Sequence, residues 1–211
     1  MSFLSYLING VSLGSVYAII ALGYTMVYGI AKMLNFAHGD IIMVGSFAAY
    51  IAMISAGVSP IVSVLLAMVI CTVLGLLIER IAYKPLRSAP SLAVLITAIG
   101  VSYFLQNMAL LVFGSDTKTF PNVVSFGGIS LAGGSLQISG VTIVTVAACI
   151  VIVVGLSLFI NKSKAGQAML AVSEDRGAAQ LMGINVNKTI ALTFAIGSAL
   201  AAVAGVLLCS A

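Results

Sequence analysis

Residues 3–31 read "FLSYLINGVSLGSVYAIIALGYTMVYGIA", and none of these side chains is charged. An α-helix of about 20 apolar residues crosses the hydrocarbon core of a bilayer, so this stretch is long enough to span it. The rest of the chain has the same character. Of its 211 residues, 62% are hydrophobic and 7% are charged, whereas a soluble domain carries about 25% charged residues. The sequence therefore predicts an all-α integral membrane protein.

Further apolar runs follow the first one, separated by polar segments or by Gly and Pro. They cover residues 41–55, 60–79, 91–113, 138–160 and 190–211. The chain is therefore expected to form one polytopic helical bundle, 1–211, with about six transmembrane helices. Gly, Ser and Thr are frequent in 114–137, so we expect an exposed loop there that contains a small hairpin.

Lysine and arginine residues predict the orientation, because short loops rich in them stay in the cytoplasm. All nine except Lys118 lie in three segments, 32–40, 79–90 and 161–189. We expect these segments to be cytoplasmic, which puts both termini outside. At the start of the second segment, Glu79 and Arg80 are expected to form a solvated ion pair or to contact a cytoplasmic partner.

The three cysteines lie in apolar runs, with no Cys or His neighbour at the spacing of a metal site. They are Cys71, Cys149 and Cys209, and we expect small buried side chains without a disulfide. The net charge of +4 follows from the basic loops. Neither a metal site nor a nucleic-acid partner is predicted.

Small residues recur every four positions in the first and the last apolar run. The two sets are Gly10, Gly14 and Ala18, and Gly197, Ala201 and Gly205. Such spacing lets helix backbones approach closely within a bilayer. The pattern fits packing inside one bundle or an interface with a second subunit, and it does not choose between them.

A polar stretch interrupts the chain between the first two apolar runs. "MLNFAHGDIIM" contains Asn35, His38 and Asp40. These side chains either lie in a plain cytoplasmic turn or line a cavity, as part of a helix that is broken or re-entrant near 33–55. The run 41–55 favours the second interpretation, because about 15 residues at ~1.5 Å each cover roughly 22 Å, less than the ~30 Å core. The three side chains are therefore candidates for a translocation path or a gate.

The longest polar segment, 161–189, contains signals for a short helix outside the membrane. Ser173 is a favourable N-cap, and Glu174 and Asp175 would then lie in the first turn, where the helix dipole favours negative charge. Gly183 suits the left-handed position after the helix end. The apolar face is formed by Ala178, Ala179, Leu181 and Met182. This face needs a partner, which is lipid headgroups, the bundle itself or a cytoplasmic protein.

Five stretches carry a resemblance to a known family. They are NGVSLGSVYAIIALGYTMVYGIAKMLNFAHGD (9–40), IERIAYKPLRS (78–88), AIGVSYFLQN (98–107), SEDRGAAQLMGIN (173–185) and ALTFAIGSALAAVAGVLL (191–208). In this order they resemble the permeases of bacterial branched-chain amino-acid ABC importers. The resemblance covers nearly the whole chain and is strongest to the shorter of the two permeases that pair in such importers.

This resemblance implies a membrane permease subunit, with no enzymatic activity, in the inner (plasma) membrane of a bacterium. Together with a second homologous permease, it would carry leucine, isoleucine or valine across the membrane. An external substrate-binding protein would release these amino acids to it. ATP would be bound by separate ATP-binding cassette subunits, since the chain has no Walker A glycine loop. No cofactor of its own is expected. Membrane lipid and the small-molecule substrate complete the expected partners.

The resemblance also implies a coupling segment that docks on the ATPase. The residues implied are Glu174, Asp175, Ala179, Leu181 and Gly183. The general motif of ABC importers begins Glu-Ala-Ala and has Gly six positions after the Glu, whereas here Asp and Arg follow the Glu and the Gly comes later. The docking role therefore rests on local similarity. Family members continue for several more spans, so the chain up to Ala211 is expected to lack C-terminal spans.

Three other functions fit the same sequence. Related permeases carry amides, urea or sugars. A secondary transporter or channel would need buried charges along its spans, for which Asp40 is the one candidate in the sequence. A structural subunit without transport is the third. Co-purification with an ATPase separates an importer from the last two.

Overall fold

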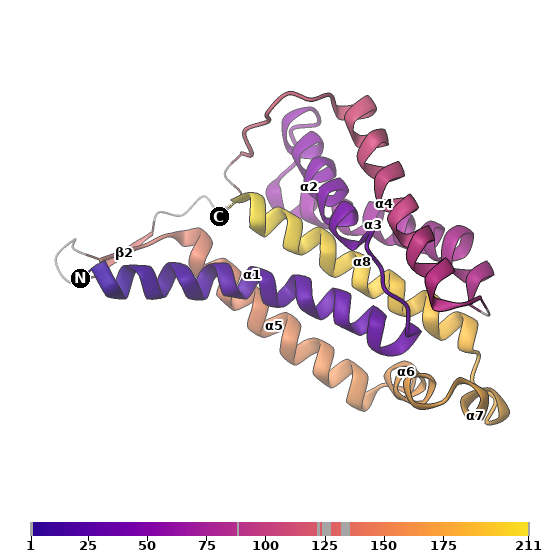
Figure 1. Ribbon diagram of the computed structural model, residues 1–211. Helices are drawn as coiled ribbons and strands as arrows, with labels where there is room; N and C mark the ends of the chain where they lie inside the picture. Colours follow the sequence, from indigo (N-terminus) through magenta and orange to yellow (C-terminus); the bar gives the residue numbers. More distant parts are fainter. Residues whose placement is uncertain (1, 88, 122, 124–127, 132–135, 211) are drawn as a thin grey trace.

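The computed structural model describes residues 2–87, 89–121, 123, 128–131 and 136–210 as a bundle of long helices (Figure 1). Within these residues, five helices are long and apolar enough to cross a membrane. They are α1 (Ser2–Ala31), α3 (Pro60–Ile78), α4 (Ser91–Phe113), α5 (Gly140–Lys162) and α8 (Val186–Ser210). A sixth apolar helix, α2 (His38–Ile54), has only 17 residues. The predicted all-α polytopic fold with about six membrane helices is confirmed.

Helix α8 lies at the centre of the bundle, against α1, α2 and α3 (Figure 1). Small residues permit these close approaches. A Cβ on Gly45 would lie 2.8 Å from the Cα of Ala202, and one on Gly75 would overlap the Ser198 side chain. The buried positions Gly197, Ala201 and Gly205 of α8 all belong to this packing. The interpretation as packing within one bundle is confirmed for α8.

Of the small residues of α1, Ala18 is partly buried and packs against the core, but the two glycines lie differently. Gly10 and Gly14 are exposed, and a Cβ at either would meet nothing within 4 Å. Their face of α1 is therefore open in this chain. An interface with a second subunit stays a prediction for this face.

The expected hairpin in 114–137 is present in part of that segment. Strand β1 (Ile129–Leu131) pairs antiparallel with β2 (Leu136–Ile138), and Ser130 lies opposite Gln137. Residues 122, 124–127 and 132–135 of the predicted loop lie outside the described residues. The hairpin leads into α5, which runs beside α1 (Figure 1).

The second basic segment, 79–90, differs from the predicted loop. The helix continues through a π-helical turn, η1 (Glu79–Tyr83), and a 3₁₀ turn, η2 (Lys84–Leu86). Glu79 is only 3% exposed and pairs with Arg87, whereas Arg80 is exposed. The expected solvated pair of Glu79 and Arg80 is wrong, because the helical continuation turns Glu79 inwards and adjacent residues on a helix do not face each other.

The cysteine prediction needs one correction. Cys71 and Cys149 are buried, as expected, but Cys209 is exposed near the end of α8. An apolar run that ends at a bundle surface leaves its last side chains uncovered by protein. No group of metal-binding side chains occurs among the described residues.

Candidate functional site

The polar stretch breaks the chain between α1 and α2. Lys32, directly after α1, has a left-handed φ of 49°, and its N–H donates to the Tyr28 carbonyl at 2.8 Å. The chain then turns until α2 begins at His38. Asn35, His38 and Asp40 are 2%, 3% and 6% exposed. The plain solvated turn is therefore wrong, and the three polar side chains lie inside the protein at a broken element.

Asn35 is held by a tyrosine that is far away in the sequence. The Tyr83 hydroxyl donates to Asn35 Oδ1 at 3.0 Å, and it also lies 3.4 Å from the Leu34 carbonyl. Tyr83 itself is fully buried, and its ring packs against Phe194 of α8 with the centroids 5.3 Å apart. The break is thus fixed to both η1 and the central helix.

Asp40 lies in the first turn of α2, where the helix dipole favours a negative charge. Its Oδ1 accepts a hydrogen bond from Gln106 Nε2 of α4 at 3.1 Å. Its Oδ2 has no hydrogen-bond partner among the described residues. A buried carboxylate with a free oxygen can accept a proton or a hydrogen bond from a moving ligand.

His38 lies in close contact with a glycine of α1. A Cβ on Gly23 would lie 3.0 Å from His38 Cε1 and 3.1 Å from the Gly197 carbonyl. The Tyr24 ring meets the imidazole edge to face at 6.0 Å. His38 Nε2 has no hydrogen-bond partner among the described residues. The imidazole is packed tightly and keeps one nitrogen available.

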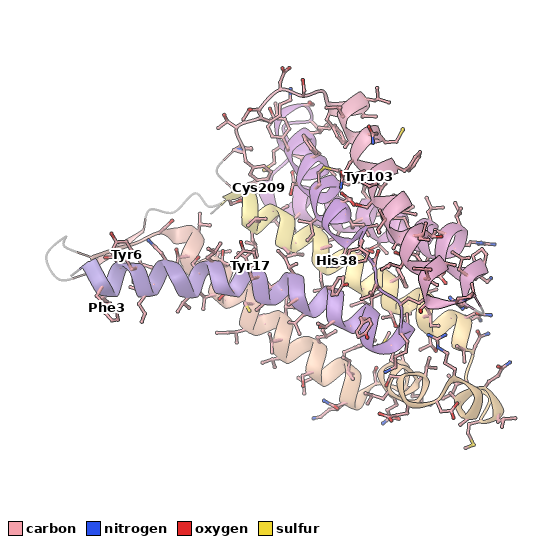
Figure 2. The ribbon with its side chains drawn as sticks, viewed as in Figure 1. Phe3, Tyr6, Tyr17, His38, Tyr103 and Cys209 are labelled. Atoms are coloured by element: carbon pink, nitrogen blue, oxygen red, sulfur yellow. The ribbon has the colours of Figure 1, made fainter. Side chains whose placement is uncertain are left out.

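A cavity of about 550 Å³ opens beside this histidine. In Figure 2, His38 lies where α2 meets α1, and Tyr17 lies farther along α1. The lining comprises Tyr17, Ile20, Ala21, Tyr24, Thr25, Asn35, Phe36, His38, Gly39 and Ile42. Mostly apolar walls with a few converging polar groups are typical of small-molecule sites.

The segment 161–189 forms two short helices instead of one. Helix α6 (Lys164–Glu174) is capped by Ser163, whose Oγ accepts the Gly166 N–H at 2.9 Å. Helix α7 (Arg176–Leu181) follows after a single residue. Both lie at the end of the bundle where α1 ends and α8 begins (Figure 1).

The predicted cap of this helix is wrong by two residues. Asp175 is extended, with φ −148°, and its Oδ1 accepts the N–H groups of Gly177 and Ala178 at 2.7 and 3.0 Å. Ser173 instead donates to the Leu170 carbonyl within α6. Both residue types are good N-caps, so composition alone did not separate them. Glu174 consequently ends α6 and does not lie in the first turn of α7.

The end of α7 is as expected. Gly183 has a left-handed φ of 84°. The Gly183 N–H donates to the Gln180 carbonyl and the Ile184 N–H to the Ala179 carbonyl, both at 3.0 Å. This is the hydrogen-bond pattern of a Schellman motif. The helix is therefore closed at both ends by local hydrogen bonds.

The two faces of α7 have opposite surroundings. Ala179 is 3% exposed, whereas Leu181 and Met182 are 91% and 82% exposed. Arg176, at the start of the helix, donates to the Ala31 carbonyl at the end of α1. One face thus rests on the bundle beside the break, and the other presents two large apolar side chains outwards.

Several residues that hold these sites were not singled out from the sequence. They are Tyr83, Arg87, Gln106 and Arg176. Gln106 is a polar residue inside an apolar run, which is a usable signal. The other three lie in the basic segments 79–90 and 161–189, where charged and aromatic residues are ordinary, and only the tertiary structure brings them to the break.

Comparisons with known proteins agree over nearly the whole chain. The family model for the permease component of branched-chain amino-acid transport systems matches residues 6–211. The high-affinity branched-chain amino acid transport system permease BraD of Pseudomonas aeruginosa is 44% identical over 98% of this chain and 70% of its own length. Its counterpart LivH of Escherichia coli K12 is 45% identical with the same coverage.

A more distant relative and the solved structures complete the comparison. A LivH described as a probable branched-chain amino acid transport permease, from Methanocaldococcus jannaschii, is 31% identical over 90% of this chain and 61% of its own length. No solved structure is significantly similar to the chain. With a family model that covers residues 6–211 and relatives above 40% identity, the chain belongs to the family of permease components of branched-chain amino-acid transport systems.

Proposed function

We propose that this chain is the permease subunit of a binding-protein-dependent ABC importer that carries leucine, isoleucine and valine into the cell. The names of its relatives support this cargo. The membrane would be the bacterial inner membrane. The three basic segments would face the cytoplasm and the N-terminus the outside, which agrees with the gathering of α6, α7 and the end of α1 at one end of the bundle.

The observation that carries the proposal is the exposed apolar face of α7. Leu181, the last residue of α7, and Met182 directly after it lie between two spans, where neither folding nor spanning requires them. Glu174 ends α6, although a helix C-terminus disfavours negative charge. Exposed apolar side chains beside a locally unfavourable carboxylate are typical of an interface. The ATP-binding subunit would cover this surface, with Glu174, Asp175, Ala179, Leu181 and Gly183 forming or shaping it.

The route from α7 to the break is short. Arg176 joins the first residue of α7 to the last carbonyl of α1, immediately before the broken element. A displacement of α7 by the ATPase would therefore pull on the end of α1 directly. Broken elements of this kind build the sites of many transporters, because their backbone groups need polar partners.

The translocation path would run past the cavity of about 550 Å³ beside the break. Its apolar walls suit an aliphatic side chain, while Asn35 and His38 offer polar groups to the amino-acid end. Asp40 would act as a gate, since its bond to Gln106 links α2 to α4 and has to open if these helices part.

The remaining partners follow from the same proposal. A second homologous permease would pack on the open face of α1, where Gly10 and Gly14 permit close approach. An external binding protein would deliver the amino acid, and ATP would be bound by the cassette subunits alone.

An ATP-independent transporter is the alternative that a specific observation favours. The buried Asp40 and His38 each keep one atom without a partner among the described residues. Such groups also serve proton coupling. The association of an ATPase with the permease distinguishes the two functions.

The test is co-purification of the ATP-binding subunits with the full-length permease from detergent-solubilised membranes. We expect the ATP-binding subunits to co-purify with the wild type. We expect this association to be lost when Glu174→Ala is combined with Leu181→Asp. The matched control is Gln167→Glu, which adds a negative charge at an exposed position of α6 and should not disturb the complex. The proposal is contradicted if no ATPase associates with the wild type. It is also contradicted if the ATPase still associates with the doubly substituted permease.

A further inference from the structure

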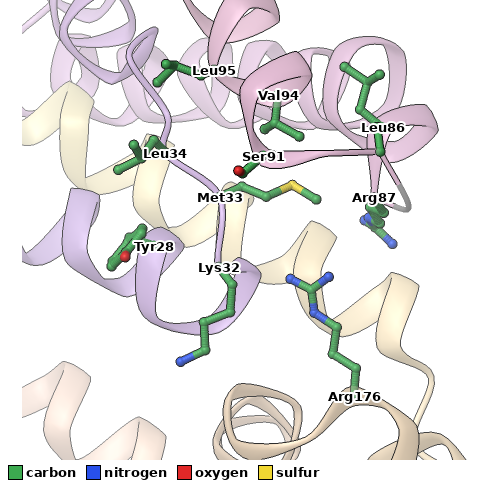
Figure 3. A pocket seen from close by; sticks show the side chains of 11 residues that line it. Tyr28, Lys32, Met33, Leu34, Leu86, Arg87, Ser91, Val94, Leu95 and Arg176 are labelled. Atoms are coloured by element: carbon green, nitrogen blue, oxygen red, sulfur yellow. The ribbon is translucent and has the colours of Figure 1, made fainter.

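A second cavity, of about 340 Å³, lies where the end of α1, the start of α4 and the start of α7 meet. Figure 3 shows its lining side chains. They are Tyr28, Lys32, Met33, Leu34, Leu86, Arg87, Ala89, Ser91, Val94, Leu95 and Arg176. It is distinct from the cavity beside His38, because the two share none of these residues.

The cationic side of this cavity is formed by Lys32, Arg87 and Arg176. No acidic residue occurs among the lining residues that the structure describes. Within the residues that the structure describes, Glu79 forms an ion pair with one of these cations, Arg87. Lys32 and Arg176 take part in no ion pair within the described residues. The cavity therefore carries an excess of positive charge.

The two arginines are close enough to act on each other. Burial, and secondly the charge of Arg87, lower the pKa of Arg176 below its ordinary value. Arg87 also donates to Asn187, yet its Nε has no partner among the described residues. Like charges held together in a partly buried place are unfavourable unless an anion lies between them. Guanidinium groups bind phosphate oxygens particularly well.

The opposite side of the cavity is apolar. Leu34, Val94 and Leu95 lie there, away from the charged groups, whereas the Met33 side chain extends toward Arg87 (Figure 3). Leu34, on this side, is 36% exposed. Because α1 and α4 are membrane helices, this apolar side continues onto surfaces that face the hydrocarbon.

A branched-chain amino acid does not suit this arrangement. Its carboxylate and side chain would find partners, but its ammonium group would lie among three cations without a carboxylate in the lining. A soluble anion would leave the apolar wall unused. The chemistry that matches both sides is a negatively charged headgroup with an attached acyl chain. Basic pockets between membrane helices at the cytoplasmic side are typical sites for such lipids.

We propose that this cavity binds an anionic phospholipid of the cytoplasmic leaflet. The phosphate lies against Arg87, Arg176 and Lys32, and an acyl chain passes along Leu34, Val94 and Leu95. The bound lipid then holds α7, α1 and α4 together at the point where Arg176 meets the end of α1. This site does not depend on which solute is transported.

The test is native mass spectrometry of the full-length permease, purified with its partner subunits. The probes are dioleoyl phosphatidylglycerol, which is anionic, and dioleoyl phosphatidylcholine, which has the same chains and no net charge. We expect the anionic lipid to be retained at least about fivefold better. Lys32→Gln should lower its affinity about fivefold, as each basic residue at a membrane surface contributes ~1 kcal/mol.

Two further variants keep the test independent of folding. Arg80→Gln removes an exposed arginine that does not line the cavity, and it should retain the lipid like the wild type. Leu95→Trp fills the apolar side and leaves every cation in place, so it should abolish retention of the anionic lipid. Glycerol 3-phosphate and leucine should not displace the lipid.

Five results would overturn the proposal. The first is equal retention of both lipids, and the second is Lys32→Gln behaving like Arg80→Gln. Displacement by leucine would make the cavity an amino-acid site, and displacement by glycerol 3-phosphate a site for soluble anions. If lipid binds only after the ATP-binding subunits are removed, the cavity is occupied in the complex by an acidic residue of that partner and not by lipid.

Discussion

Two of the buried polar residues at the break are each held by a side chain that is distant in the sequence. Asn35 accepts from Tyr83, and Asp40 accepts from Gln106. Because both groups are buried inside the protein, water does not readily replace a lost hydrogen bond, and the group left behind stays unsatisfied. At the scale of the residue, these pairs fix the break more strongly than its own sequence does.

Tyr83→Phe removes only the hydroxyl that Asn35 Oδ1 accepts from. Leaving a buried acceptor without a donor costs about 1–3 kcal/mol. We expect a lower melting temperature of the purified permease in detergent. Tyr103→Phe removes the hydroxyl of a tyrosine that is 64% exposed, and it should melt like the wild type. Equal melting temperatures for both variants would show that the bond does not stabilise the fold.

Gly23→Ala tests the close fit of His38. The new methyl group would lie 3.0 Å from the imidazole and 3.1 Å from the Gly197 carbonyl. We expect the ring to be displaced and solute uptake to fall at unchanged expression. Gly29→Ala, in the same helix with nothing within 4 Å of its Cβ, is the control for helix propensity. Uptake that is equal in both variants would remove His38 from the path.

At the scale of the element, small residues and caps determine how the helices lie. Helix α8 touches its neighbours through glycine, alanine and serine, and α7 is held by Asp175 at its start and Gly183 beyond its end. These contacts are short and leave little room for larger side chains. For substitutions at these contacts, the direction of the change in stability can therefore be predicted.

Gly75→Ala places a methyl group where the Ser198 side chain lies. Overpacking of this kind destabilises by about 1–3 kcal/mol. The melting temperature should fall, and Ser198→Gly in the same chain should restore part of it. Gly100→Ala, where the Cβ meets nothing within 4 Å, is the matched control. A double variant that is no more stable than Gly75→Ala would contradict the α3–α8 contact.

Asp175→Ala removes the N-cap of α7, which is expected to cost about 1 kcal/mol. Hydrogen exchange at Gly177 and Ala178 should become faster, because both N–H groups donate to this carboxylate. Ser173→Ala should leave their exchange unchanged. If Ser173→Ala has the larger effect, the helix begins where its sequence first indicated and not at Arg176.

At the scale of the whole molecule, the sequence predicts what depends on apolar length. The spans, the break near 33–55 and the left-handed Gly183 all follow from composition or from local backbone chemistry. The start of α7 and the pairing of Glu79 do not. Two good caps lie within three residues of each other, and the partner of Glu79 is decided by a helical continuation that no local signal indicates. Tertiary packing, not propensity, settles both.

The measurement that tests the central claim most directly is uptake of radiolabelled leucine by cells without their own leucine importers. These cells would express the full-length permease with its partner subunits and binding protein. We predict uptake that requires ATP and the binding protein, is competed by isoleucine and valine but not by urea or ribose, and is lost with Leu181→Asp. Absence of leucine uptake with all partners present, or uptake that continues without ATP, would contradict it.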